Sequence, residues 1–284
     1  MLALEQTKQI KDFVKQKPRT MNEVSQLLDV NWRTADRYVG KIAESTGELA
    51  VRTFREGTRG ALKVVYWRGL GELAFTDLQQ ELFEKIAAGR SKTDFSPFEI
   101  YQYVDKQKKQ AFLEEQDEEA ATSLYDFAET LRAAEGEALF FSGNFSWINL
   151  QDGRTSLYGV VKALAGRGIV CKALCRVELG GLENIERVLA LNKSFGKQVI
   201  EIRHCYQPLR AVVIDDKLAR FKEIKNPADY KNLELKKKTF IFYEIRDKDW
   251  VEWIGKVFWR LFNNSVPAEK RIEELHKIRK LKGN

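Results

Sequence analysis

Three cationic side chains recur at intervals of four residues near the start of the chain: Arg33, Arg37 and Lys41. In an α-helix this spacing places all three on one face. The residues that would form the opposite face recur at i, i+3, i+4 and i+7 and are mostly apolar: Ala35, Tyr38, Val39 and Ile42. Arginine forks bond phosphate oxygens and match the O6 and N7 atoms of guanine. The stripe therefore predicts a helix that contacts a nucleic acid.

The segments around this stripe predict a helix-turn-helix. Apolar spacing predicts a helix over 4–16, which Pro18 ends. Thr20 and Glu23 form a capping-box pattern, so a second helix is expected over 21–28. A short turn leads to a third helix over 32–43, with Asn31 as its cap. Two helices joined by a tight turn can lay the second one in the major groove of DNA.

Two strand-like segments follow, over 49–55 and 62–67, rich in β-branched and aromatic residues. Between them Arg59 lies in a glycine-bearing hairpin loop, as in the wing of a winged helix-turn-helix domain. A wing arginine contacts phosphates or the minor groove. In such a domain, over 1–70, we expect these DNA-binding residues: Trp32, Arg33, Thr34, Arg37, Lys41, Arg55 and Arg59. The alternative is a winged helix that contacts proteins only.

Net charge changes sign twice along the chain. It is +5 over residues 1–70, −9 over 71–140 and +11 over 141–284, for a total of +7. The basic first segment attracts a polyanion, whereas the acidic segment would repel one. Residues 71–135 carry apolar residues at helical spacing, so we expect an acidic helical linker there. Its role would be dimerisation or packing within one protomer.

Residues 136–265 predict an α/β domain with a mixed sheet. Apolar runs and helical patterns alternate in the order β-α-β-α-β-β-β-β-α, and a basic tail follows over 266–284. No stretch reaches the ~18 uncharged apolar residues of a membrane helix, and the N-terminus lacks the pattern of a secretory signal. The expected fold class is α+β or α/β, and the expected location is the cytoplasm.

Cysteine usage agrees with a reducing compartment. The three cysteines, Cys171, Cys175 and Cys205, are too few for a disulfide framework. Cys171 and Cys175 fall in one predicted strand, where residues four apart are about 13 Å from each other. One metal ion could not bind both, so we expect buried structural cysteines, no metal site and no cofactor.

A second group of polar residues could bind a ligand: Ser142, Asn144, His204, Arg210 and Asp215. Arg210 and Asp215 would take an anion or a polar effector, or would form a salt bridge with each other. The chain has two histidines, His204 and His276, which are few for a hydrolase that uses histidines as catalytic groups.

The segment 201–220 resembles the motif region of the phospholipase D-like superfamily, whose active motif is His-x-Lys-x4-Asp. Arg210 stands at the lysine position and Asp215 follows at the family's spacing, but Pro208 stands at the histidine position. The family's chemistry needs a histidine nucleophile that forms a phospho-enzyme. The resemblance implies a phospholipase D-like fold without catalytic residues, and hence a protein that is not an enzyme. A phosphodiesterase or nuclease assembled across a dimer is the alternative.

The whole arrangement of predicted domains resembles the TrmB-like transcription regulators of archaea. In these a winged helix, a helical linker and a motif-poor phospholipase D-like domain follow one another. The resemblance implies a homodimeric regulator that binds double-stranded DNA and whose C-terminal domain senses a small-molecule effector. A protein-interaction adaptor built on the winged helix is a further alternative.

Overall fold

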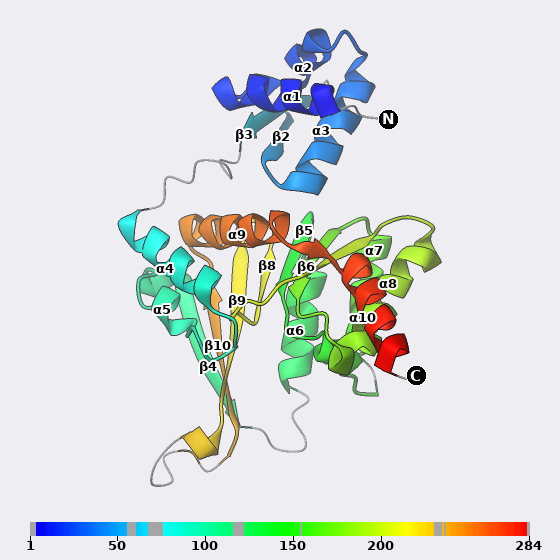
Figure 1. The fold of residues 1–284 in the computed structure, drawn as a ribbon. Coiled ribbons are helices and arrows are strands. Elements are labelled where there is room, and N and C mark those ends of the chain that lie inside the picture. The colour runs from blue at the N-terminus through cyan, green and yellow to red at the C-terminus, as the bar shows by residue number, and fades with distance from the viewer. Residues whose placement is uncertain are drawn as a thin grey trace. The chain divides into compact units, whose positions relative to one another are not determined.

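The computed structural model describes residues 4–55, 61–67, 76–115, 122–153, 155–229, 235 and 237–282. The chain divides into two compact units, Met1–Ala74 and Phe75–Asn284. Figure 1 shows a small sheet with helices in the smaller unit and a much larger sheet with helices in the other.

Among its described residues the smaller unit contains three helices and three strands. They are α1 (Leu4–Gln16), β1 (Arg19–Thr20), α2 (Met21–Leu27), α3 (Trp32–Thr46), β2 (Leu49–Arg55) and β3 (Ala61–Trp67). The strands pair antiparallel in the order β1-β3-β2. The segment 56–60, where the wing loop is expected, lies outside the described residues.

Two predicted caps begin the helices of this unit. The N–H of Glu23 donates to Thr20 Oγ1 over 3.2 Å, and the N–H of Thr20 donates back to Glu23 Oε2 over 2.7 Å. This reciprocal pair is the capping box expected at α2, and it lowers the pKa of Glu23. Asn31 Oδ1 accepts from the N–H of Thr34 over 2.9 Å and begins α3.

The core of the smaller unit joins all three helices to the sheet. It consists of nine buried side chains: Ile10, Val14, Met21, Val24, Ala35, Val39, Ile42, Leu49 and Val65. The apolar face predicted for the third helix is therefore the face that α3 buries. Its other face remains free to carry charge.

The larger unit contains the remaining elements. In chain order they are α4 (Asp77–Ala88), α5 (Phe98–Tyr101), η1 (Lys106–Lys108), β4 (Lys109–Glu115), α6 (Thr122–Arg132), β5 (Glu137–Phe141), η2 (Ser146–Asn149), α7 (Leu157–Gly166), β6 (Val170–Cys175), η3 (Leu179–Gly181), α8 (Leu182–Phe195), β7 (Ile200–His204), β8 (Ala211–Ile214), β9 (Leu218–Lys225), η4 (Pro227–Asp229), β10 (Thr239–Ile245), α9 (Lys248–Asn263), β11 (Val266–Pro267) and α10 (Ala268–Lys282). From β5 to α9 the order of main strands and helices is the one that the sequence predicts.

One mixed sheet of eight strands organises this unit, in the order β11-β7-β6-β5-β8-β9-β10-β4. Strands β5, β6 and β7 run parallel, and the remaining neighbours pair antiparallel. Helix α9 packs on one face, where Phe258 meets Phe141 edge-on with ring centroids 5.2 Å apart. Side chains of α6, α7, α8 and α10 join the core on the other face (Figure 1).

Two predicted boundaries differ from the structure. Residues 71–135 are not a helical linker, because β4 lies within them and pairs along its whole length with β10. Residues 266–284, predicted as a basic tail, are part of the larger unit, because β11 pairs with β7 and α10 buries Ala268, Ile272 and Leu275 in the core. Both errors have one cause: local patterns do not reveal which distant strand will supply a partner.

Cys171 and Cys175 are buried in β6, as expected. None of the described helices is both long and apolar enough to cross a bilayer.

Candidate anion-binding site

The larger unit encloses a cavity of about 340 Å³ at one edge of its sheet. The wall includes residues that follow β5 and β6, residues at the start of β8, and part of β9. Strands β5 and β6 are parallel, so their carboxyl ends meet at this edge. Ligands of α/β sheets usually bind at this position.

Backbone hydrogen bonds hold the polar parts of the wall. The N–H of Arg176 donates to the carbonyl oxygen of Gly143 over 2.7 Å, which joins the loops after β5 and β6. The N–H of Lys222 donates to the carbonyl oxygen of Arg210 over 2.8 Å, which continues the pairing of β8 and β9. These four residues come from four separate segments of the chain.

Three cations on the wall form no ion pair with a described residue, although Glu114 lies near enough to raise the pKa of Lys222 against the effect of burial. Within the described part of the chain, Arg176, Arg210 and Lys222 form no ion pair and donate no side-chain hydrogen bond, and the described wall contains no aspartate or glutamate. Burial, followed by the nearby Arg176, lowers the pKa of Arg210. Burial, followed by Arg210, lowers the pKa of Lys222 to about 8. Unpaired positive charge gathered in a partly buried cavity favours an anionic ligand.

Lys92 also reaches the wall and ties its loops together. Its Nζ donates to the carbonyl oxygens of Ser142 (3.3 Å), Gln207 (2.9 Å) and Leu209 (2.5 Å). Burial, with Arg210 and Arg176 nearby, lowers its pKa to about 6. The three carbonyl oxygens act in the opposite sense, because an ammonium has three N–H groups to donate and a neutral amine has two. We assign Lys92 a positioning role.

Arg220 differs from the other cations on the wall because it is paired. Its guanidinium contacts Glu244 at 3.4 Å and Asp126 at 3.5 Å, and it donates to Thr130 Oγ1 over 3.0 Å. Its charge is therefore largely compensated inside the protein.

The rest of the wall is apolar and aromatic, with Phe127, Phe140, Trp147 and Phe242 among its members. Trp147 Nε1 donates to Ser142 Oγ over 3.1 Å, so the hydroxyl lies where aromatic and cationic parts of the wall meet. A ligand of this cavity would combine a negative group with an uncharged body.

The sequence-predicted ligand residues separate into two groups. Ser142, Asn144 and Arg210 lie on the cavity wall, whereas His204 and Asp215 do not. His204 Nδ1 instead accepts from the N–H of Val177 over 2.9 Å and joins the ends of β6 and β7.

Asp215 has a structural task at the far end of β8. Its carboxylate accepts from the N–H groups of Glu135 (3.1 Å), Gly136 (2.8 Å) and Glu137 (2.9 Å). Arg210 and Asp215 flank β8 on opposite sides, and an extended strand rises about 3.3 Å per residue. Neither a shared ligand site nor a salt bridge between them is therefore formed.

Sequence reasoning missed Lys92, Arg176 and Lys222. Arg176 directly follows β6, and such ends line ligand crevices in α/β sheets, but the strand predicted there ran over 169–177 and contained Arg176. Lys92 lies between α4 and α5 in a polar segment without a motif. Lys222 looks like an ordinary strand lysine until β8 and β9 pair.

The second candidate site lies on α3 of the smaller unit. Arg33, Arg37 and Lys41 are exposed there, on the face opposite the core. Trp32 is 37% exposed and lies under Lys63 Nζ, 5.1 Å from the ring centroid. Thr34 is half-buried, and its N–H bonds the cap of the helix. The side chain of Arg55 and all of Arg59 lie outside the described residues.

Comparisons with known proteins concern the larger unit. No family model matches this sequence. No curated protein matches it either. The solved structures to which the C-terminal part is similar include a phospholipase D family member.

Three solved structures are similar in fold. Nuc from Salmonella typhimurium, a phospholipase D family member, has a TM-score of 0.41 and 14% identity, and the match covers 56% of this chain and 98% of that one. NucT from Helicobacter pylori has a TM-score of 0.41 and 12% identity, covering 56% and 99%. Polyphosphate kinase from Porphyromonas gingivalis has a TM-score of 0.36 and 10% identity, covering 75% and 49%.

These findings correct one prediction and leave others open. The prediction that the chain is not an enzyme is contradicted, because the similar structures carry the names of a phospholipase D family member and a kinase. The likeness itself extends no further than the fold. The TrmB-like resemblance and the winged helix-turn-helix receive no support from the comparisons and stay predictions.

Proposed function

We propose that the larger unit binds a phosphodiester group in the cavity and acts on it as a phosphodiesterase-type enzyme. One observation carries the proposal: Arg176, Arg210 and Lys222 line a single cavity, and none of the three forms an ion pair with a described residue. Arginine binds phosphate oxygens with two parallel hydrogen bonds, and lysine adds a point charge. A phosphodiester supplies the negative charge that the wall lacks.

The same cations can serve the chemistry. Attack on phosphorus increases the negative charge on its oxygens, so fixed positive groups stabilise the transition state more than the bound ester. No histidine is among the described residues of the wall, and the hydroxyl groups there belong to Ser142 and Ser146. We therefore assign charge stabilisation to the cations. Water attacks: its oxygen bonds to phosphorus, the bond from phosphorus to one ester oxygen breaks, and that oxygen leaves as an alcohol that takes a proton from the water.

The test measures binding and hydrolysis separately. Bis(4-nitrophenyl) phosphate and a short single-stranded oligonucleotide are offered to the full chain, and binding is followed by tryptophan fluorescence. Arg210→Met is expected to weaken binding and lower the hydrolysis rate, each by about tenfold or more. Arg132→Met removes an exposed arginine that pairs with Glu129 and should change neither. Absence of binding by the unaltered chain, or binding that Arg210→Met leaves intact, contradicts the site, and binding without turnover contradicts the enzyme.

For the smaller unit we propose duplex DNA binding through α3. The exposed stripe of Arg33, Arg37 and Lys41 supports this, because its three charges follow one face at helical spacing. A role in transcription regulation would use this contact. A duplex bound by the smaller unit would also bring phosphodiesters to the same chain. The homodimer and the small-molecule effector stay predictions.

Fluorescence polarisation of labelled duplex DNA at several salt concentrations tests whether the smaller unit binds DNA. Each lost phosphate contact reduces the slope of log affinity against log salt by about one. The triple variant Arg33→Ala, Arg37→Ala, Lys41→Ala should lower duplex affinity and flatten that slope. Lys8→Ala removes an exposed lysine of α1 and serves as the control. Equal slopes for the triple variant and the unaltered chain would refute duplex binding by α3.

A further inference from the structure

Strand β4 forms one end of the eight-stranded sheet and pairs only with β10 within the described residues. Its seven residues keep an unbroken antiparallel register with Thr239–Ile245. They include no proline and no glycine. Edge strands usually avoid association through a proline, a bulge, a covering element or charged side chains, and β4 carries charges only at its two ends. Because β4 is long and regular, its outer side can accept another strand.

The backbone groups that face outward can be identified. The N–H of Arg246 donates to the carbonyl oxygen of Lys108 over 2.8 Å, so the backbone of residue 108 faces β10. In an antiparallel pair every second residue faces the same side. The alternate residues therefore present their N–H and C=O groups outward: Lys109, Ala111, Leu113 and Glu115.

We propose that β4 pairs antiparallel with β4 of a second copy of this chain, about a twofold axis at Phe112. In this register Lys109 faces the partner's Glu115, and Ala111 faces the partner's Leu113. All four outward-facing residues of each strand then form backbone hydrogen bonds. The strand begins with a cation and ends with an anion, so the charges at both ends of the new pair are opposite.

Other registers satisfy fewer groups. Outward groups occur on alternate residues, so the strands can shift only by two. Such a shift leaves the charge of Lys109 or of Glu115 without its counterpart across the pair. A parallel pair in register would place lysine beside lysine and glutamate beside glutamate, which is unfavourable. The sequence Lys-Gln-Ala-Phe-Leu-Glu-Glu therefore favours its own antiparallel copy over the other registers of self-pairing.

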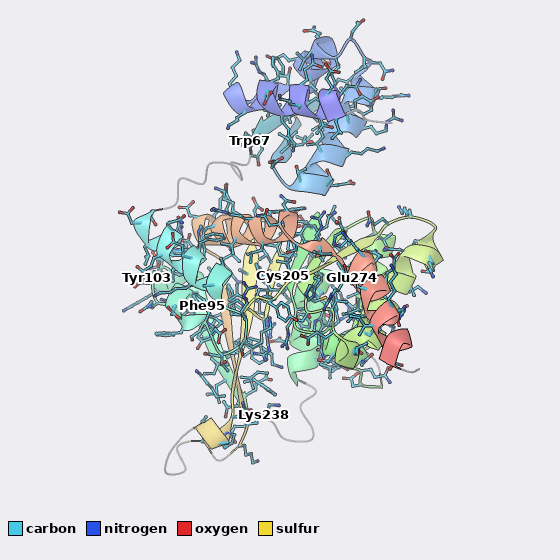
Figure 2. All side chains as sticks on the ribbon, in the orientation of Figure 1. Trp67, Phe95, Tyr103, Cys205, Lys238 and Glu274 are labelled. Carbon is cyan, nitrogen blue, oxygen red and sulfur yellow. The ribbon has the colours of Figure 1, made fainter. Side chains whose placement is uncertain are left out.

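Exposure at the edge agrees with this partner. Leu113 is 59% exposed, and Ala111 beside it is exposed too. On the same face Lys109 Nζ donates to the carbonyl oxygen of Tyr101, which brings α5 next to the strand. Tyr103, 50% exposed, lies beside α5 in Figure 2. Pairing with a second β4 would cover Leu113, and burial of apolar surface favours association.

Analytical ultracentrifugation of the full chain over a wide concentration range tests the proposal, and a concentration-dependent dimer is expected. Leu113→Pro removes an outward N–H and leaves the ladder with β10 intact, so the dimer should dissociate at a concentration about 100-fold higher. Leu113→Thr keeps the N–H and should weaken the dimer less than tenfold. An unaltered chain that stays monomeric, or a proline variant that dimerises normally, overturns the proposal.

A charge exchange gives an independent readout should the proline variant fail to fold. Glu115→Lys places lysine opposite lysine twice in the dimer and should weaken it by about tenfold. Adding Lys109→Glu restores opposite charges and should recover much of the loss. Circular dichroism verifies the fold of each variant. If the double variant dimerises no more tightly than Glu115→Lys, the proposed register about Phe112 is contradicted.

Discussion

Nζ of Lys92 donates to the carbonyl oxygen of Gln207 over 2.9 Å. A side chain from the segment between α4 and α5 thereby holds the loop that leads to Arg210. Gln207 itself is buried, and its Nε2 donates to the carbonyl oxygen of Ser142 over 3.0 Å. Both sides of the cavity are thus joined through one lysine and one amide.

Lys92→Met should destabilise the protein. The substitution removes the Lys92 donor from the buried carbonyl oxygens of Gln207 and Leu209, whereas the carbonyl oxygen of Ser142 keeps Gln207 Nε2, so we expect the free energy of unfolding to fall by about 2–4 kcal/mol. Phosphodiester affinity should fall as well, because Arg210 loses its support. Lys85→Met, which removes an exposed lysine paired with Glu81 and Glu99, should leave stability nearly unchanged. Urea denaturation measures the stability of both variants. Equal midpoints for Lys92→Met and the unaltered chain would contradict the positioning role.

Phosphodiester affinity should decrease as pH rises through about 8, the pKa of Lys222. Only the protonated amine attracts the anion, and a phosphodiester keeps one charge throughout. From about pH 7 to about pH 9 we expect a three- to tenfold loss of affinity. Lys222→Arg should remove this dependence, and isothermal titration calorimetry measures it. A flat profile for the unaltered chain would show that Lys222 does not contact the ligand.

The ligand-free protein should respond to pH in the opposite direction. The pKa of Lys222 is about 8 in the folded chain and about 10.4 in the unfolded one. Between these values the unfolded chain binds more protons, so this residue makes stability rise with pH. Comparison of denaturation midpoints with those of Lys222→Met isolates the contribution.

Arg176→Met should weaken phosphodiester binding and stabilise the ligand-free protein. The substitution removes repulsion with Arg210 and replaces an unpaired cation by an apolar side chain, and a gain of about 1 kcal/mol corresponds to about 2–4 °C in Tm. Differential scanning calorimetry with and without pyrophosphate measures both effects. Pyrophosphate should raise the Tm of the unaltered chain more than that of the variant. A variant that melts earlier than the unaltered chain would indicate that Arg176 has a structural partner.

Asp215→Ala should lower stability and leave ligand binding unchanged. Three backbone N–H groups lose their carboxylate acceptor, at a cost of about 3 kcal/mol. Asp215→Asn keeps one acceptor oxygen and tolerates the positive φ of 53° at this position, so its loss should be smaller. Reduced phosphodiester affinity in a folded Asp215→Asn variant would return this residue to the ligand site.

Local patterns predicted most of the elements correctly. The capping pair of Thr20 and Glu23 and the apolar stripe through Val39 depend on residues a few positions apart, and their interactions form within one helix. The order of elements from β5 to α9 was equally accessible. The prediction of a helical linker was wrong because Phe112 and its neighbours belong to a strand whose partner lies more than a hundred residues away in sequence.

The site was predicted in part for the same reason. Arg210 was found through a motif resemblance. His204 and Asp215 were chosen from the same segment, but their side chains accept hydrogen bonds from backbone N–H groups and stabilise the fold. An extended strand rises about 3.3 Å per residue, so Arg210 and Asp215, which are close in sequence, lie at opposite ends of β8.

The amino-acid sequence by itself determined the caps, the buried faces and the cationic stripe of α3, because each arises from contacts within a turn or two of backbone. The tertiary structure alone decided that Lys92, Arg176, Arg210 and Lys222 share one cavity and that β4 is the end strand of the sheet, with no second partner strand among the described residues. Those outcomes depend on strand order and on loop closure over long distances, which burial of the whole core selects and no short pattern encodes.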